Sequence, residues 1–296
     1  MNAARPTKIT RIRFIIVNSY PMVWLLQPLT YEFMQRGLLA SLMVGVLCAV
    51  MGTYVVLRGM AFLGDALAHA ILPGVAIAYL LRGNLLVGAL VAAVVVALSI
   101  GLFSRRGAVK EDTAIGILFA AALALGVALI SSIQTYAVDL THILFGNVLG
   151  VSAKDLWLTA GLGMLILTVV AIYYKQFLVI TFDPVLAATL RLPADFLRYL
   201  MLILLALTVV VSLQTVGMGL SAAMLVTPAA TAYLLTRRLF PMMLVSAAIG
   251  AVSSLSGLYL SYYLNIVSGS AIVLVATAIF MFAFLFNPRQ GILRKK

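Results

Sequence analysis

The sequence predicts an all-α polytopic membrane protein with about nine transmembrane helices, and we expect between eight and ten. Its composition is the first reason: 64% of the 296 residues are hydrophobic and only 9% are charged, whereas a soluble domain carries about 25% charged residues. Secondly, the apolar runs are about 20 residues long, the length at which a helix crosses roughly 30 Å of hydrocarbon. Finally, the alternating pattern of an outer-membrane barrel is lacking, so the spans are helices.

Short polar clusters divide the chain into apolar spans. The predicted spans are 37–57, 61–81, 84–103, 113–133, 155–174, 197–217, 218–236, 241–263 and 270–287. We therefore predict one transmembrane domain over residues 34–288, which follows a basic tail over 1–33 and precedes another over 289–296. These segments leave no room for a soluble domain, so an ATPase, receptor or catalytic domain would belong to another chain.

The formal charge of +12 arises mainly from Lys and Arg between the spans and at the two ends. With nine alternating spans, the basic clusters from Arg58 to the C-terminal tail fall on one side, which is the cytoplasm by the positive-inside rule. This distribution argues against a nucleic-acid partner and places the C-terminus in the cytoplasm of a bacterial cell. If residues 14–31 form a tenth span, the basic N-terminal tail joins that side. Alternatively, they form an interfacial helix anchored by Tyr20, Trp24 and Tyr31.

Asp65 and His69 are ionisable residues inside the second predicted span. Residues four apart share a helix face, so the two side chains could hold the same divalent cation or the same proton. A carboxylate oxygen and an imidazole nitrogen suit Mn²⁺, Fe²⁺ or Zn²⁺ better than Ca²⁺. Ionisable groups in a membrane helix are costly and indicate a permeation or coupling role. The alternative is a structural hydrogen bond between the two, with Arg58 as a candidate third partner, that fixes the helix near its cytoplasmic end.

Glycine and proline interrupt several spans where a transporter could bend. Pro73 and Gly74 follow one turn after His69, and Pro228 lies within another span. Gly217 and Gly219 separate two runs with almost no loop between them. We expect these five residues to act as hinges or gates, although Gly and Pro are also ordinary in membrane helices.

The segment 180–193 has the pattern of a short cytoplasmic helix. Asp183 is a candidate N-cap, Pro184 suits the first helical position, and Pro193 ends the segment. Such a helix could dock in a groove of a partner, or it could be a connecting turn.

Glu111 and Asp112 are expected to stabilise the N-terminus of the span 113–133 as helix-dipole partners. His142 could meet incoming metal on the outer side, or lie on a loop surface.

The order and content of several motifs are similar to the membrane permeases of the ABC-3 metal transporters, which import manganese, zinc or iron. The resemblance covers roughly residues 30 to 287. It is carried by Val55–Ala76 with Asp65 and His69, Lys110–Ile117, Ile143–Gly146, Phe182-Asp183-Pro184 with Ala187, Leu225–Ala232 and Leu260–Tyr263 with Ser268-Gly269. It implies a permease like those of type II ABC importers. The partners that it implies are a second permease (identical or different), two cytoplasmic ATPase subunits and an extracellular or periplasmic metal-binding protein. The complex would lie in the bacterial cell membrane.

The same resemblance assigns roles to individual residues. Asp65 and His69 match the intramembrane Asp-x-x-x-His position of the family and would line the metal pathway. Phe182, Asp183, Pro184, Ala187, Arg191 and Pro193 would form the segment that meets the ATPase. Arg191 departs from the family, which usually has Gly there, and a helix continuing past Leu190 is then an option.

The expected function is import of a divalent transition metal by a permease subunit that is not itself an enzyme and holds no permanent cofactor. Mn²⁺ is favoured because His142–Leu149 and Met34–Arg36 resemble manganese-type members. Zn²⁺ and Fe²⁺ are alternatives, because coordination chemistry does not separate the three ions at such a site. A proton-coupled secondary metal transporter, a permease for metal chelates and an intramembrane enzyme are competing classes. The sequence contains no phosphate loop, nucleophile elbow or metalloprotease motif.

Overall fold

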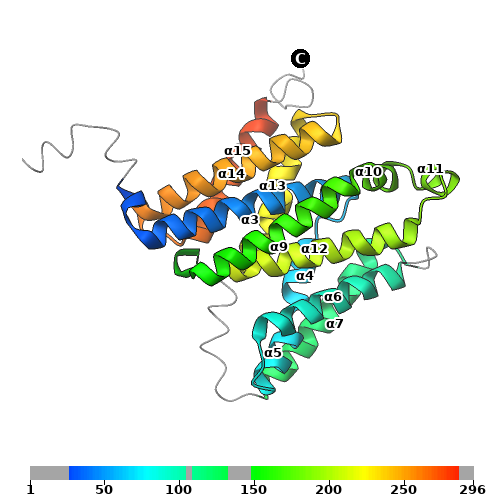
Figure 1. Ribbon diagram of the computed structural model, residues 1–296, viewed down its shortest axis with the longest axis horizontal. Coiled ribbons are helices and arrows are strands. Elements are labelled where there is room, and N and C mark those ends of the chain that lie inside the picture. Colours follow the sequence, from blue (N-terminus) through cyan, green and yellow to red (C-terminus); the bar gives the residue numbers. More distant parts are fainter. Residues whose placement is uncertain (1–26, 105–108, 133–147, 287–296) are drawn as a thin grey trace, which may run out of the picture.

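A computed structural model describes residues 27–104, 109–132 and 148–286, and these residues form helices without any strand. Figure 1 shows long helices crossing the molecule, with two short helices, α10 and α11, at one end. The elements are η1 Pro28–Thr30, α3 Glu32–Leu57, α4 Leu63–Ala70, α5 Leu72–Leu80, α6 Leu85–Phe103, α7 Glu111–Ser131, η3 Val148–Gly150, α9 Ala153–Ile172, α10 Tyr174–Phe182, α11 Pro184–Thr189, α12 Ala194–Val216, α13 Met218–Leu235, α14 Leu239–Leu264 and α15 Ser268–Phe286.

The helices have the lengths that the hydropathy pattern predicts. Within the described residues, eight helical spans are long and apolar enough to cross a membrane, and the helix over Leu220–Leu235 is apolar but shorter. Together they match the predicted spans in number and order, which confirms the all-α polytopic fold. The predicted tenth span over 14–31 and the role of His142 lie mostly or wholly outside the described residues.

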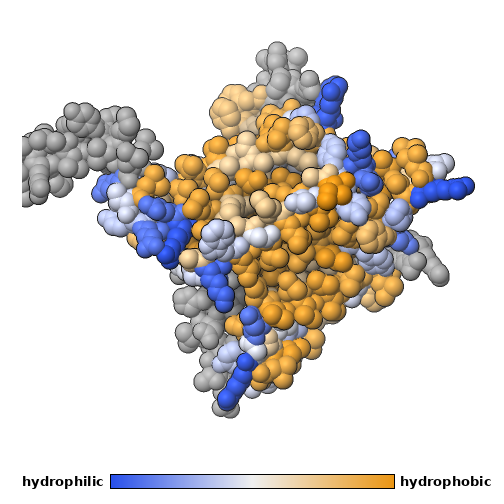
Figure 2. All heavy atoms as spheres, viewed as in Figure 1, coloured by the Kyte–Doolittle hydropathy of each residue, from blue (hydrophilic) through white to orange (hydrophobic). Residues whose placement is uncertain are grey.

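Burial separates central from peripheral helices. Two thirds (67%) of the residues in the apolar windows of α3 and α12 are buried, whereas only 17% are buried in those of α7 and α15. Figure 2 shows a broad apolar surface across the middle of the molecule, with the hydrophilic residues toward its edges. An apolar surface of this extent is expected where helices face lipid or another membrane chain.

Glycines allow the central helices to approach closely. A Cβ atom at Gly45 of α3 would lie 2.9 Å from the carbonyl oxygen of Gly250 in α14, and one at Gly250 would lie 2.5 Å from that of Gly45. At Gly52 a Cβ would lie only 1.7 Å from the carbonyl oxygen of Leu225 in α13. Small residues at such crossings are typical of membrane helix pairs, because van der Waals packing drives their association.

The helices differ from the predicted spans at two places that hydropathy does not reveal. The span 61–81 consists of α4 and α5, which are separated at Ile71, and Pro73 lies in the first turn of α5. Beyond α9, the chain turns at Tyr173 and continues as α10, where the sequence suggested a connection. We refer to the end of the molecule that carries α10, α11, the last turn of α3 and the first turns of α7 and α12 as the α11 end.

Candidate functional site

Asp65 and His69 lie on the same face of α4, as their spacing predicts. The Nδ1 atom of His69 lies 2.9 Å from the backbone carbonyl oxygen of Asp65 and 3.6 Å from its Oδ1 atom. Because a carbonyl oxygen only accepts, Nδ1 carries the proton in this arrangement, and Nε2 keeps its lone pair for a metal or a proton. The side chains of His69 and Asp65 are 27% and 39% exposed. Both side chains are therefore accessible.

An aromatic contact orients the His69 ring. Phe119 of α7 meets it edge to face with ring centroids 5.7 Å apart, and Phe62 meets Phe119 at 5.4 Å. The imidazole is thus held between its own helix backbone and α7. Arg58, which the alternative hypothesis placed with this pair, contacts Glu111 instead. That part of the structural hypothesis is wrong.

The pair alone is an incomplete metal site. In the part of the chain that the structure describes, no three His, Cys, Asp or Glu residues lie close enough to hold one ion. Two protein ligands are fewer than the three or four of a typical zinc site and far fewer than the six or more of a calcium site. As a metal site the pair would need further ligands, and weak binding would suit an ion that has to be released.

The break between α4 and α5 is packed tightly against two neighbouring helices. A Cβ at Gly74 would lie 2.2 Å from the carbonyl oxygen of Gly88 in α6, and one at Gly126 in α7 would lie 2.7 Å from the Cβ of Leu72. Pro73 has no backbone N–H, so the helix cannot continue regularly through this point. Gly74 is therefore needed for close packing, and its predicted role as a hinge stays a prediction.

The other predicted hinges lie between or inside buried helices. Gly217 joins α12 to α13 with φ 87° and ψ 170°, a conformation that is essentially restricted to glycine. Gly219 lies in the first turn of α13, and Pro228 lies inside the same helix. A Cβ at Gly64 of α4 would lie 2.9 Å from a side-chain carbon of Leu225 in α13. Helix α13 therefore adjoins the helix that carries Asp65.

The predicted docking segment forms a helix shorter than its sequence boundaries. Asp183 caps α11 by accepting a hydrogen bond of 2.9 Å from the Leu186 N–H, and Pro184 opens the helix as predicted. Ala187 is fully buried, whereas Val185 and Leu190 are 77% and 56% exposed. Phe182 ends α10 with 60% exposure, and Pro193 is the N-cap residue of α12. The segment thus presents apolar side chains to its surroundings.

Arg191 does not continue α11, and the prediction of a helix past Leu190 is wrong. Its φ of 53° lies in the left-handed region. The Arg191 N–H bonds to the carbonyl of Ala188, and the Leu192 N–H bonds to that of Ala187, at 3.1 and 3.0 Å. This is a Schellman motif, in which glycine is usual at the position that Arg191 occupies. The need to satisfy the last helical carbonyls sets the backbone here, whichever side chain is present.

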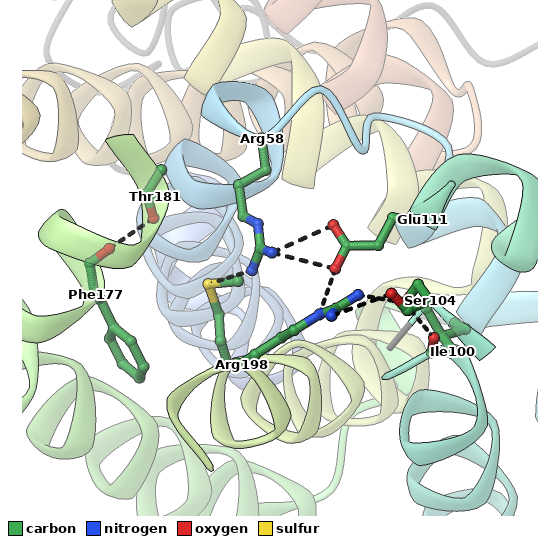
Figure 3. A network of polar contacts seen from close by, with 8 residues as sticks. Arg58, Ile100, Ser104, Glu111, Phe177, Thr181 and Arg198 are labelled. Carbon is green, nitrogen blue, oxygen red and sulfur yellow. Dashed lines mark hydrogen bonds and ion pairs between the residues drawn. The ribbon is translucent and has the colours of Figure 1, made fainter. Parts of the chain in front are cut away.

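A cluster of charged residues at the α11 end was missed by sequence reasoning. The Glu111 carboxylate accepts hydrogen bonds from Arg58 Nη2, at 3.2 and 3.3 Å, and from Arg198 Nε, at 2.7 Å. Arg198 also bonds to Ser104 Oγ, and Arg58 Nη1 lies 3.9 Å from the sulfur of Met201. Figure 3 shows the three charged side chains pointing toward one another.

This charge cluster is largely shielded from solvent. The side chains of Arg58, Glu111 and Arg198 are 15%, 19% and 20% exposed. Burial lowers the pKa of the Arg58 guanidinium from its usual value, and the neighbouring Glu111 carboxylate opposes that change. Glu111 also lies in the first turn of α7, as the helix-dipole prediction required. The available sequence signal was the rarity of such residues, since only eight Asp and Glu occur in the chain.

Comparisons with known proteins agree with the fold and with the motifs. The model of the ABC 3 transport family matches residues 30–287. The chain is 48% identical over 269 residues to the manganese transport system membrane protein MntC of Halalkalibacterium halodurans, with 91% and 92% of the two chains covered. It is 42% identical over 264 residues to a probable iron transport system membrane protein of Haemophilus influenzae, with 89% and 97% covered. The solved structure of PsaBC from Streptococcus pneumoniae in complex with Fab is similar at a TM-score of 0.79 and 39% identity, over 95% of this chain and 97% of that one.

Proposed function

This chain belongs to the ABC 3 transport family, and from this we propose that it is the permease subunit of an ATP-binding cassette importer that carries divalent transition-metal ions, principally Mn²⁺, into the cytoplasm. The accessible Asp65 and His69 pair in a broken membrane helix is the observation that carries this proposal. Relatives named for manganese transport support Mn²⁺. Fe²⁺ is the first alternative because other relatives are named for iron, and Zn²⁺ fits the same donor atoms.

Asp65 and His69 would offer the ion one carboxylate and one imidazole as it crosses. Nδ1 of His69 is engaged by the Asp65 carbonyl oxygen at 2.9 Å, which leaves Nε2 to bind the metal. A second permease protomer, identical or different, would supply further ligands at the exposed face of this pair. The ion would bind weakly enough to move on, and neither residue acts as a chemical catalyst.

The driving force would come from two ATPase subunits on separate chains. Exposed apolar side chains of α11 and the adjoining Phe182 and Leu190 would dock in a groove of the ATPase, since apolar patches of this kind mark interaction sites. In this orientation the α11 end would lie in the cytoplasm of a bacterial cell. The positive-inside rule supports the same side for the basic residues of that end and for the C-terminus. An extracellular or periplasmic binding protein would deliver the ion on the opposite side.

The decisive experiment is ATP-dependent uptake of radioactive Mn²⁺, Fe²⁺ and Zn²⁺ by the complex reconstituted in vesicles with its ATPase and binding protein. Asp65→Asn and His69→Ala are expected to lower uptake of the preferred ion at least about tenfold, because the first removes the carboxylate charge and the second removes the imidazole ligand. Asp112→Asn is the matched control, since it removes an exposed carboxylate at the start of α7. His142→Ala tests the predicted entry role in the same assay.

Two outcomes would contradict the proposal. Undiminished uptake by both Asp65→Asn and His69→Ala, at native expression, would remove the pair from the pathway. Uptake driven by a proton gradient without any ATPase would instead establish a secondary transporter that uses Asp65 and His69 for protons.

A further inference from the structure

The charge cluster of Arg58, Glu111 and Arg198 joins three elements that are distant in the sequence. Glu111 is separated by 53 residues from Arg58 and by 87 from Arg198. Its carboxylate receives hydrogen bonds from both guanidinium groups, so one side chain ties the last turn of α3 to the early turns of α7 and α12 (Figure 3). Ser104 at the end of α6 completes the contact, because its hydroxyl meets Arg198 and bonds to the Ile100 carbonyl at 2.6 Å.

Partial burial makes this contact sensitive to the loss of Glu111. With side-chain exposures between 15% and 20%, the two guanidinium groups are poorly hydrated, and the Glu111 carboxylate bonds to both of them. Removing one partner of a buried ion pair leaves an uncompensated charge, which is costly even where the pair itself adds little stability. The cluster therefore has a strongly preferred arrangement and resists small displacements of any one member.

Each member of the cluster leads directly to a part of the transport machinery. Arg58 is the C-cap of α3, and the short turn after it enters α4, which carries Asp65. Glu111 is the first residue of α7, whose Phe119 holds the His69 ring. Arg198 lies in α12, the helix that begins immediately after the docking helix α11.

The connection between α11 and α12 is a hydrogen-bonded corner. The Leu192 N–H bonds to the Ala187 carbonyl at 3.0 Å, and the Ala194 N–H bonds to the Leu192 carbonyl at 2.8 Å. Ala187 is fully buried and fastens α11 to the body of the protein. A second contact joins α10 to α3, where the Phe177 and Tyr54 rings meet edge to face at 5.7 Å. A displacement of α11 would thus be passed to α12 and to the end of α3, because packed helices move as rigid elements.

From this geometry we infer that Glu111 is a positioning residue that couples movement of the docking helix to the Asp65 and His69 pair. When α11 moves, Arg198 moves with α12 and draws Glu111, and Glu111 in turn shifts the start of α7 and the turn leading to α4. The inference rests on the proposed function. It concerns how movement of α11 is transmitted to Asp65 and His69, and the charge cluster itself does not contact the ion.

The test compares Glu111→Gln with Asp112→Asn in the assembled complex, and it measures Mn²⁺ uptake and ATP hydrolysis in the same vesicles. Glutamine keeps the shape of Glu111 but removes the charge, and Asp112 is the adjacent exposed carboxylate. We expect Glu111→Gln to lower the ratio of uptake to hydrolysis about tenfold or more, while hydrolysis stays within about twofold of the native rate. Asp112→Asn should keep the native ratio.

A merely structural role would give a different result. Loss of folding lowers uptake, hydrolysis and the amount of assembled complex together, and leaves the ratio unchanged. Arg198→Lys provides a milder variant, since lysine keeps the charge but cannot reproduce the several N–H groups of the guanidinium. It should lower the ratio in the same direction by a smaller factor.

An unchanged ratio in Glu111→Gln, or an equal fall in Asp112→Asn, would overturn the inference. If Glu111→Gln does not assemble, a native ratio in Arg198→Lys would overturn it. The failure of the proposed function is distinguishable, because the native complex would then show no ATP-driven uptake at all.

Discussion

The broken helix that carries Asp65 and His69 is predicted to depend on the absence of a side chain at Gly126. A Cβ there would lie 2.7 Å from the Cβ of Leu72 and 3.2 Å from the Cδ of Pro73, whereas one at Gly116 of the same helix would meet nothing within 4 Å. Gly126→Ala and Gly116→Ala therefore add the same methyl group to α7 in two different surroundings.

The expected magnitudes follow from two opposing effects. Alanine is favoured over glycine inside a helix by about 1 kcal/mol, and this gain applies to both variants. Overpacking costs roughly 1–3 kcal/mol, and it applies only to Gly126→Ala, because a Cβ atom cannot rotate away from its neighbour. We expect Gly116→Ala to be neutral or stabilising. We expect the free energy of unfolding of Gly126→Ala to be about 1–3 kcal/mol lower than that of Gly116→Ala.

The assay is thermal unfolding of the two purified variants in one detergent at one scan rate. A difference of 1 kcal/mol corresponds to about 2–4 °C in a chain of roughly this size, so Gly126→Ala should unfold at least about 2 °C below Gly116→Ala. Mn²⁺ uptake should fall more in Gly126→Ala, because the methyl group displaces the α4 and α5 junction. Equal unfolding temperatures for the two variants would refute the close contact and the reasoning built on it.

Three further changes, the last with a matched control, test the backbone and the caps. Arg191→Gly should stabilise the protein by about 1 kcal/mol, because glycine adopts the left-handed conformation without the cost that other residues incur; a lower unfolding temperature would contradict this. Gly217→Ala should cost about 1–3 kcal/mol, measured as a lower unfolding temperature, and a neutral result would exclude strain at that junction. Asp183→Ala should weaken copurification of the ATPase by loosening α11. The control Ser152→Ala removes the N-cap of α9. Loss of either cap should cost about 1 kcal/mol of stability, but Ser152→Ala should leave copurification of the ATPase unchanged. An equal loss of copurified ATPase in both variants would deny α11 a docking role.

Local chemistry made several features predictable. Asp65 and His69 share a face because four residues span about one helical turn, and the hydrogen bond from His69 to the Asp65 carbonyl stays within that turn. Asp183 and Pro184 start α11 where the capping rules place them. In both cases the interacting groups are neighbours in the chain, so their geometry depends little on the rest of the fold.

Long-range contacts were not predictable in the same way. The sequence indicates Arg198 only as a charge that orients the chain in the membrane, and Arg58 either as such a charge or as a partner of Asp65 and His69. It indicates Glu111 only as a helix-dipole partner. Their mutual contact depends on where α3, α7 and α12 end in space, which apolar periodicity does not encode. Hydropathy averages over α4 and α5 and does not reveal the break at Ile71, although Pro73 and Gly74 predict a bend close to it.

The sequence by itself determined the membrane class, the number and order of the membrane spans, the shared helix face of Asp65 and His69, and the start of α11. These follow from hydropathy, helical periodicity and capping, all of which act within about 20 residues. Only the tertiary structure decided that Glu111 bridges Arg58 and Arg198, that Gly74 and Gly126 exclude side chains around the broken helix, and that Arg191 ends α11. Such features depend on the distances between separate helices, or on the satisfaction of backbone carbonyls at a corner, and both are set by how the whole chain packs.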